Sequence, residues 1–440
     1  MGGGQTHGNL AADWKGASDS MTDHGMKTLP QAAGTAVPLG LLGAAAFLVA
    51  VDVRMIDPLL PIIAGEFGTD VGGAALAVTA YAIPYGLCQL VYGPLGDRLG
   101  KVRVMAGALA AFALGTGACA FAPSLAVLVV LRLLTGVAAA ALFPMALAYI
   151  GDTFPYATRQ AAIGRLVGAI ALGQIASAGL GGFFGQYASW RSLFGLCGLA
   201  ALAAAALLWR AARATPCPSA AGGAQPRGVL APYLGLLKLP ATRLMMAVVF
   251  LEGGFFFGAF AYLGAFLREQ YGLPYGAIGL ILGGFGLGLL VASRAVRPLL
   301  ATLGERALMG AGGSLVAAVY LALTSLGSWQ LAVPLIVALG AGFSMLHTTL
   351  QTKATELAPA ARGTAVALFA FSISLGQGVG AAAMGRLATS AGFTPLFVCA
   401  GCAVALLTLG LVLRGDRLQR PAAGTVDGSA LAASGATVAD

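Results

Sequence analysis

Of the 440 residues, only 9% are charged and 58% are hydrophobic, and the formal net charge is +9. A soluble protein devotes about a quarter of its residues to charged side chains. This composition therefore excludes a soluble globule and leaves lipid as the solvent for most of the surface. The basic residues stand in short segments between apolar runs and form no basic face, which excludes a nucleic-acid-binding protein.

The chain begins with a polar, glycine-rich stretch. Residues 1–37 show no signal-peptide pattern and are predicted to form a disordered cytoplasmic tail. A membrane helix needs roughly 20 apolar residues, whereas a spanning β-strand needs about ten of alternating polarity. The apolar runs that follow have the helical length. We expect twelve transmembrane helices, near 38–63, 74–95, 103–122, 124–149, 160–186, 191–211, 243–267, 275–299, 306–326, 329–350, 363–388 and 392–414.

One long internal break divides these runs. The stretch 212–242 is rich in proline and is predicted to be a cytoplasmic linker. It separates an N-terminal six-helix half, 38–211, from a C-terminal six-helix half, 243–414. Residues 415–440 are predicted to be a disordered cytoplasmic tail.

The two halves carry traces of an internal repeat, because Leu303–Met309 echoes Leu99–Met105. We therefore predict an all-α membrane protein of two pseudo-symmetric halves. Such repeats are typical of secondary transporters, whose substrate site lies near the bilayer midplane between the halves.

Basic residues by loop give the orientation. Almost all of them fall on the side of the N-terminus, and the exceptions are Arg191, Arg268 and Arg386. By the positive-inside rule, both termini are expected in the cytoplasm. Heavy use of alanine, glycine and arginine suggests a bacterial gene, so we expect a multi-pass protein of the bacterial inner membrane.

Two motifs lie in and beside the predicted helices. The loop after the second helix reads Gly93-Pro94-Leu95-Gly96-Asp97-Arg98-Leu99-Gly100-Lys101-Val102-Arg103. It resembles the signature loop between helices 2 and 3 of the major facilitator superfamily. The fourth helix, with Leu128, Arg132 and Gly136 at intervals of four, resembles the second signature of that family. The resemblance covers residues 38–414.

The resemblance is to the twelve-helix drug/proton antiporters and related exporters. It implies a monomeric secondary active transporter that exports a drug, a sugar or a secreted metabolite such as a siderophore, by proton antiport with alternating access. It also implies a gating role for the loop, through Gly93, Asp97, Arg98, Gly100, Lys101 and Arg103. The glycine–proline pair that antiporters often carry in helix 5 is missing here, so a proton-coupled or facilitative importer stays open as the alternative.

The first helix holds three charged residues, Asp52, Arg54 and Asp57. Charge inside a membrane is costly and marks function or a local pair. Arg54 and Asp57 stand three residues apart and can pair on one helical face, with Asp52 turned elsewhere. Desolvation favours the protonated form of a carboxyl group. Either Asp52 or Asp57 is therefore a candidate proton site, the alternative being a static structural pair.

Further candidates lie in later helices. Arg132 is expected to face the cavity and a carboxylate of helix 1, and the resemblance implies that it tunes proton release. Glu252 could meet a cationic substrate group or a second proton, or could lie at the membrane edge. His347 is a candidate because histidine is the side chain that ordinarily changes charge near neutral pH, although a lone histidine in an apolar helix is often only hydrogen-bonded. Candidate cavity aromatics are Tyr81, Tyr85, Phe143, Phe255, Phe256, Phe257, Phe260 and Tyr262, of which only some are expected to line the cavity.

Several classes are excluded by missing motifs. The sequence has no G-x4-G-K-[ST] loop, no H-E-x-x-H motif and no G-x-S-x-G elbow. We therefore expect no enzyme activity, no cofactor and no metal site. Cys399 and Cys402 fall inside the last helix and are interpreted as small packing residues. The expected partners are a small-molecule substrate, protons and the lipid bilayer; a channel is disfavoured because six-plus-six helices fit a single-chain carrier.

Overall fold

The computed structural model describes residues 37–214, 231–357 and 362–414. This part of the chain is helical and contains no strand. Twelve of its segments are long and apolar enough to cross a membrane, from Leu39–Glu66 to Phe393–Leu413. The twelve-helix, all-α membrane fold predicted from the sequence is thereby confirmed.

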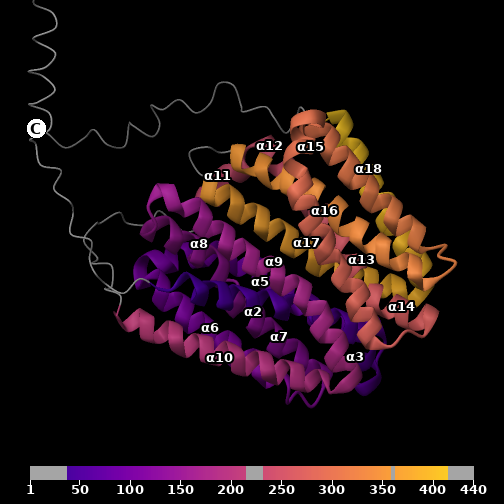
Figure 1. The fold of residues 1–440 in the computed structure, drawn as a ribbon, viewed down its shortest axis with the longest axis horizontal. Coiled ribbons are helices and arrows are strands. Elements are labelled where there is room, and N and C mark those ends of the chain that lie inside the picture. The colour runs from indigo at the N-terminus through magenta and orange to yellow at the C-terminus, as the bar shows by residue number, and fades with distance from the viewer. Residues whose placement is uncertain (1–36, 215–230, 358–361, 415–440) are drawn as a thin grey trace, which may run out of the picture. The chain divides into compact units, whose positions relative to one another are not determined.

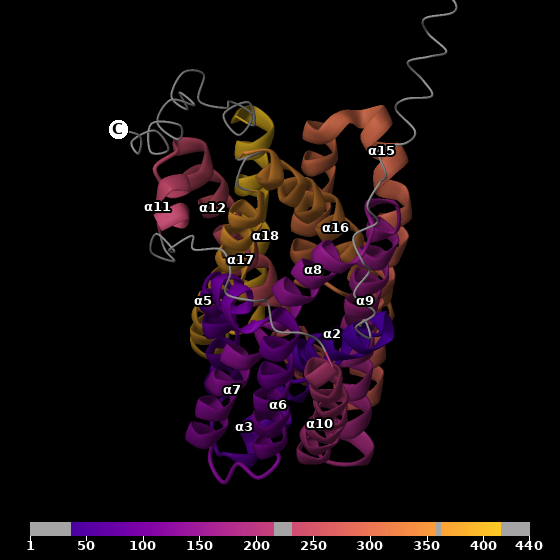
Figure 2. The same ribbon diagram turned by 90° about the vertical axis from the view of Figure 1, so that its left-hand side faces the viewer.

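The N-terminal half runs from α2 to α10. Its elements are α2 (Leu39–Arg54), η1 (Asp57–Leu59), α3 (Leu60–Glu66), α4 (Val71–Ala74), α5 (Leu76–Leu99), α6 (Lys101–Cys119), α7 (Leu125–Ala139), α8 (Leu142–Thr153), α9 (Tyr156–Tyr187) and α10 (Trp190–Ala214). Figures 1 and 2 show these helices in indigo to magenta, gathered together.

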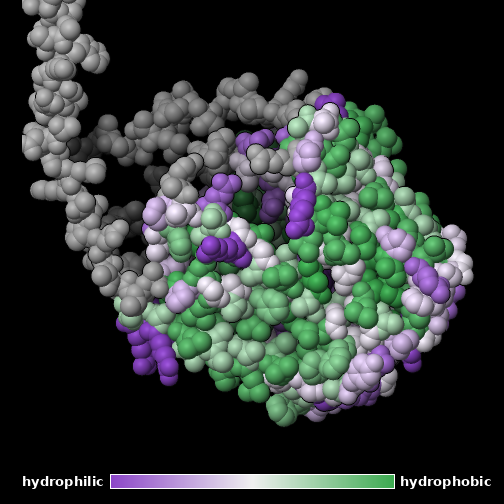
Figure 3. All heavy atoms as spheres, viewed as in Figure 1, coloured by the Kyte–Doolittle hydropathy of each residue, from purple (hydrophilic) through white to green (hydrophobic). Residues whose placement is uncertain are grey.

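The C-terminal half runs from α11 to α18. Its elements are α11 (Ala231–Leu237), α12 (Pro240–Glu252), η2 (Gly253–Phe257), α13 (Gly258–Phe260), α14 (Leu263–Tyr271), α15 (Tyr275–Leu323), η3 (Trp329–Leu331), α16 (Ala332–Glu356), α17 (Arg362–Ala391) and α18 (Phe393–Arg414). The flank of the bundle is covered by apolar residues, and hydrophilic ones gather toward its ends (Figure 3).

The short helix α11 lies inside the stretch predicted to be a linker. Its Tyr233 hydroxyl donates a hydrogen bond to the backbone oxygen of Leu90 at 3.0 Å, which ties α11 to α5 of the other half. Partial burial raises the pKa of the Tyr233 phenol.

The first span of each half is broken near its middle. In the N-terminal half, α2 ends at Arg54, and Asp57 with Pro58 begins a new turn. Proline lacks an amide hydrogen and favours the start of a helix. In the C-terminal half, α12 ends at Glu252 and continues as the π-helix η2. A π-helical turn inside an α-helix is frequent at functional sites. Both breaks lie beside charged residues.

The internal repeat is visible at two sharp corners. Gly100 and Gly304 both have positive φ, 89° and 76°, a conformation that glycine adopts without a steric penalty. Next to each corner, an ion pair joins the residue that follows the glycine to the C-terminal end of the fourth span of that half. Lys101 pairs with Asp152, and Glu305 pairs with Lys353 at 2.5 Å. The charges are exchanged between the two repeats.

The two halves contact each other along α5 with α17 and α9 with α15. The Thr79 hydroxyl donates to the backbone oxygen of Gly378 at 3.0 Å, and the Gln186 side chain accepts from the backbone nitrogen of Gly276 at 2.6 Å. Glycines allow backbones to approach closely in lipid. A Cβ on Gly182 would lie 2.7 Å from the Cα of Gly279, so this contact has no room for a side chain.

Replacing Gly182 with valine is expected to open this contact. Overpacking costs about 1–3 kcal/mol, and each 1.4 kcal/mol is a factor of ten in population. In a background without native cysteines, labelling of Ala178→Cys, which is buried in this contact, by a membrane-impermeant maleimide should rise about tenfold. Gly179→Val is the matched control, because a Cβ there meets no atom within 4 Å. Equal labelling in the two variants would contradict the interface.

Candidate functional site

A cavity of about 410 Å³ lies between the two halves. Its wall is formed by α2, α5, α8 and α9 on one side and by η2, α15, α16 and α17 on the other. This volume lies in the range of small-molecule sites, about 300–1,000 Å³. The wall is largely apolar, and its polar or charged members are Arg54, Gln174, Ser344, His347, Thr348, Gln351 and Gln377.

Aromatic rings line part of this cavity. Tyr85, Phe143 and Phe257, which the sequence predicts, lie on its wall together with Phe343. Phe343 has no signal in the sequence, because an apolar helix gives no sign of which face meets a cavity. Three of the other predicted rings lie elsewhere: Tyr81 stacks on Arg132, Phe256 is buried among other rings, and Phe260 lines a smaller space.

The first charged pair joins Asp52 of α2 to Arg132 of α7. Their side chains are fully buried, and Nη1 of Arg132 lies 2.5 Å from Oδ2 of Asp52. Arg132 also donates to the Asp52 backbone oxygen at 3.3 Å, and the Thr116 hydroxyl donates to Oδ1 of Asp52 at 3.3 Å. The guanidinium lies 4.2 Å from the centre of the Tyr81 ring. Arg132 therefore meets a carboxylate of the first span inside the N-terminal half, and the cavity wall does not include it.

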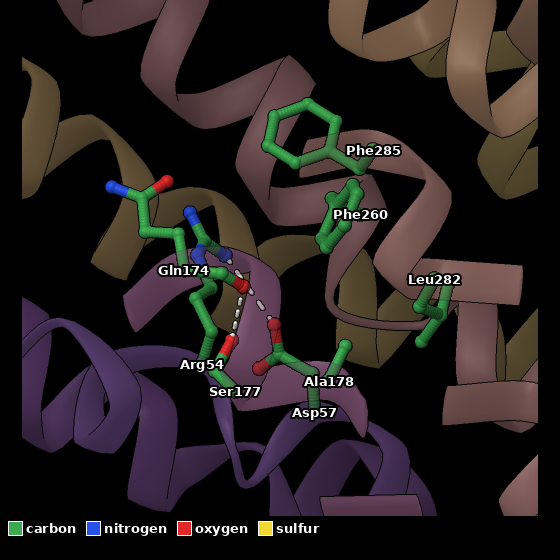
Figure 4. A pocket seen from close by; sticks show the side chains of 8 residues that line it. All are labelled: Arg54, Asp57, Gln174, Ser177, Ala178, Phe260, Leu282 and Phe285. Atoms are coloured by element: carbon green, nitrogen blue, oxygen red, sulfur yellow. Dashed lines mark hydrogen bonds and ion pairs between the residues drawn. The ribbon is translucent and has the colours of Figure 1, made fainter. Parts of the chain in front are cut away.

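The second pair, Arg54 and Asp57, lies at the break of the first span. Nη1 of Arg54 is 3.4 Å from Oδ2 of Asp57, and Nη2 of Arg54 donates to Gln377 at 3.4 Å (Figure 4 shows the ion pair). The guanidinium also lies 4.0 Å from the centre of the Phe257 ring. Arg54 reaches the main cavity, so this pair stands at the cavity wall.

Asp57 is less well compensated than Asp52. It is buried, and its Oδ1 has no hydrogen-bond partner among the described residues. A small space of about 10 Å³ adjoins it, lined also by Gln174, Ser177 and Phe260 (Figure 4). That is roughly the room one water molecule needs.

The third pair joins Glu252 of α12 to His347 of α16. Nδ1 of His347 lies 3.2 Å from Oε1 of Glu252 and 3.4 Å from Oε2. The Glu252 side chain is 1% exposed, whereas that of His347 is 18% exposed and lines the cavity. The imidazole stacks on Phe343, with ring centres 4.7 Å apart. The sequence singles out both residues but gives no sign that they meet.

The predicted gating loop is only partly described. Gly93 and Gly100 lie at the end of α5, Arg98 and Arg103 are exposed, and Lys101 pairs with Asp152. The side chain of Asp97 lies outside the described part of the structure. The gating role of this loop therefore stays a prediction.

Two broken spans around an apolar cavity with charged pairs beside it are typical of secondary transporters. The chain matches the family profile of the Major Facilitator Superfamily over residues 42–360 and 265–435. It belongs to this family and is a multi-pass membrane transporter of a small molecule.

Known proteins resemble the chain to different extents. The uncharacterized transporter YwfA of Bacillus subtilis is 28% identical over 370 residues, covering 82% of this chain and 86% of that protein. The thioclapurine efflux transporter tcpA of Claviceps purpurea is 33% identical over 147 residues, covering 33% of this chain and 27% of that protein. The inward-facing structure of a bacterial homologue of the human lysosomal transporter Spinster is 17% identical, with a TM-score of 0.68, covering 86% of this chain and 95% of that one. The last similarity shows the shared fold.

Proposed function

We propose that this protein exports a small, largely apolar organic molecule across a bacterial inner membrane, in exchange for protons. The observation that carries the proposal is the cavity of about 410 Å³ with the Arg54–Asp57 pair at its wall. The apolar and aromatic lining favours a drug or an apolar metabolite over a sugar, because a sugar needs many hydrogen-bonding groups around it.

Orientation is inferred from charge. The cavity extends from Arg54 toward Gln351, near the end of α16 that carries Lys353. The corners with Lys101 and Arg306 stand where most basic residues of the loops gather. Since basic loops stay in the cytoplasm, we assign this end and both termini to the cytoplasm. The cavity then faces inward, and the glycine contacts between the halves close the opposite end.

Asp57 is the proposed proton site. Asp52 has a permanently charged guanidinium at 2.5 Å and a second donor, so its charge is well satisfied. Asp57 has one ion-pair partner at 3.4 Å and one unpartnered oxygen. The turn that begins at Asp57 packs against α9 of its own half and against α14 and α15 of the other. Proton uptake there would weaken its pair with Arg54 beside the contact that alternating access must break.

The similarity of the chain to a known efflux transporter supports the export direction. The transporter of Claviceps purpurea that matches a third of the chain is named for efflux. In this account, a proton from outside and a substrate from inside bind in alternate halves of the cycle, and the pH gradient drives the substrate outward.

Everted membrane vesicles test this proposal. Respiration acidifies their lumen, and an acridine dye reports the pH. A panel of apolar drugs, a sugar and a siderophore would be added outside, or preloaded inside. Export predicts that an outside compound releases lumenal protons and restores the dye signal, and that vesicles without the protein do not respond. Recovery that requires the compound inside the lumen would identify an importer and overturn the proposal.

A further inference from the structure

The two halves are built around equivalent acid–base pairs. In the N-terminal half, Asp52 on the first span meets Arg132 on the fourth. In the C-terminal half, Glu252 on the first span of the half meets His347 on its fourth. Both acids are at most 1% exposed, and each lies near the break of its span. The pairs thus join the same two helices in each repeat.

The base differs between the two pairs. A guanidinium stays protonated at all accessible pH values, whereas an imidazole gains and loses its proton near neutral pH. Arg132 is fully buried, while His347 reaches the cavity. The N-terminal pair is therefore a fixed connection, and the C-terminal pair is its counterpart with an ionisable base at the cavity wall.

The geometry distinguishes the two ring nitrogens of His347. Nδ1 is held by the Glu252 carboxyl group, and Nε2 makes no hydrogen bond among the described residues. Nε2 is not fully buried, and His347 lines the cavity, so this nitrogen is accessible from the cavity. When the pair lacks its extra proton, Nδ1–H donates to the carboxylate and Nε2 presents a lone pair. When the proton is present, on either residue of the pair, Nε2 carries a hydrogen.

We propose that Nε2 of His347 is the atom at which a proton and a hydrogen-bond donor of the substrate compete. This inference rests on the proposed export by proton exchange and names its substrate class. That class is an apolar molecule bearing an ammonium or another N–H donor. Both ligands need the same lone pair, so each lowers the affinity of the other by the same factor. Competition of this kind makes substrate binding depend on pH, while Asp57 remains the group whose protonation is proposed to permit the return of the empty carrier.

The groups named below, which lie around the Glu252–His347 pair, are either aromatic or already held in ion pairs of their own. On α17, which packs against α12 and α16, the ring beside His347 is Phe369, at 5.1 Å between centres. The next charged residue along α16 is Lys353, which holds Glu305 of α15 at 2.5 Å. The π-helix η2 contributes no ionisable side chain. Across the cavity the charged group is Arg54, itself paired with Asp57.

The charges agree with a cationic substrate. The Arg54–Asp57 pair is neutral in sum, and Glu252 with a neutral His347 carries one negative charge. A deprotonated pair therefore attracts an ammonium group into an apolar cavity, and protonation of the pair removes that attraction. The aromatic walls, Phe257 and Phe343, lie 4.9 Å apart and add favourable contact with a cation.

Ring-¹⁵N histidine NMR of the full chain in lipid nanodiscs tests the site directly. The other two histidines, His7 and His24, are replaced by glutamine so that one ring remains. At high pH we expect the proton on Nδ1 and a bare Nε2, which gains a hydrogen as pH falls. Glu252→Gln should remove the Nδ1 preference, because the carboxylate that accepts from Nδ1–H is then absent. Glu356→Gln, an exposed acid on the same helix, is the matched control and should leave the preference unchanged. A ring protonated on Nε2 at high pH would overturn the proposal.

A pair of fluorescent probes tests the substrate class. 1-Naphthylmethylamine carries a donor and 1-naphthylacetate carries an acceptor on the same apolar ring. Below the titration midpoint, amine binding should weaken up to tenfold per pH unit, and acetate binding should strengthen. His347→Gln should flatten both dependences. Absent amine binding, or amine binding that ignores pH, would overturn the assignment. Neither measurement needs transport, so a failure here leaves the vesicle result standing, and a failure of export leaves the binding result standing.

Discussion

Replacing Asp57 with asparagine is expected to abolish proton-driven accumulation of substrate while leaving downhill exchange intact. Asparagine has nearly the same shape as aspartate and keeps an oxygen toward Arg54, which lies 3.4 Å away in the native protein. It cannot take up a proton. For each proton carried per cycle, a pH difference of one unit sustains about a tenfold substrate gradient. The variant should show a gradient near one, measured as tracer accumulation in liposomes under an imposed pH difference.

A matched control separates this effect from a general loss of acidic charge. Glu269 lies exposed on α14, away from the cavity wall, and Glu269→Gln should accumulate substrate as the native protein does. Full accumulation by Asp57→Asn would show that the proton binds elsewhere and would rule Asp57 out.

The largest effect on stability is expected for Arg132→Met. This change leaves the Asp52 carboxylate fully buried without its cation. Breaking a buried pair by removing one partner costs about 3–5 kcal/mol, because an uncompensated charge remains inside. The free energy of unfolding, measured by titration with denaturing detergent in mixed micelles, should fall by that amount.

The double variant Asp52→Leu with Arg132→Met is expected to regain most of this loss, since replacing both members of a buried ion pair by apolar side chains is often close to neutral. Because the pair is a fixed connection in our account, the double variant should also keep proton coupling. A double variant as unstable as Arg132→Met alone, or one without coupling, would argue against this role.

Sequence patterns predict the spans well because each apolar run has the length that lipid demands. They do not predict the breaks inside the spans. The run 243–267 is expected to be one helix, yet η2 interrupts it at Gly253–Phe257. There the backbone of Gly253 packs against Ile373 of α17, and a Cβ on Gly258 would lie 2.7 Å from Gly380. Such close approach depends on a helix more than one hundred residues away and leaves no local signal.

For the candidate site too, the sequence predicts the charged residues but not their partners. The cost of burying charge in lipid singles out Asp52, Asp57, Arg132 and Glu252 from the sequence alone. The partners follow from helix adjacency, which no local pattern reveals. Only the structure shows that Asp52 is held by Arg132 while Glu252 meets His347. The sequence leaves open which carboxylate takes a proton, and the unpartnered oxygen of Asp57 is what favours one over the other.

Proton movement in liposomes tests the central claim most directly. The purified protein would be reconstituted with a pH dye in the lumen and no pH gradient, and a transported compound would be applied on one side. We predict that lumenal pH changes in the direction of proton movement opposite to the substrate, and that the change is lost in Asp57→Asn. Protons moving in the same direction as the substrate would contradict export by proton exchange.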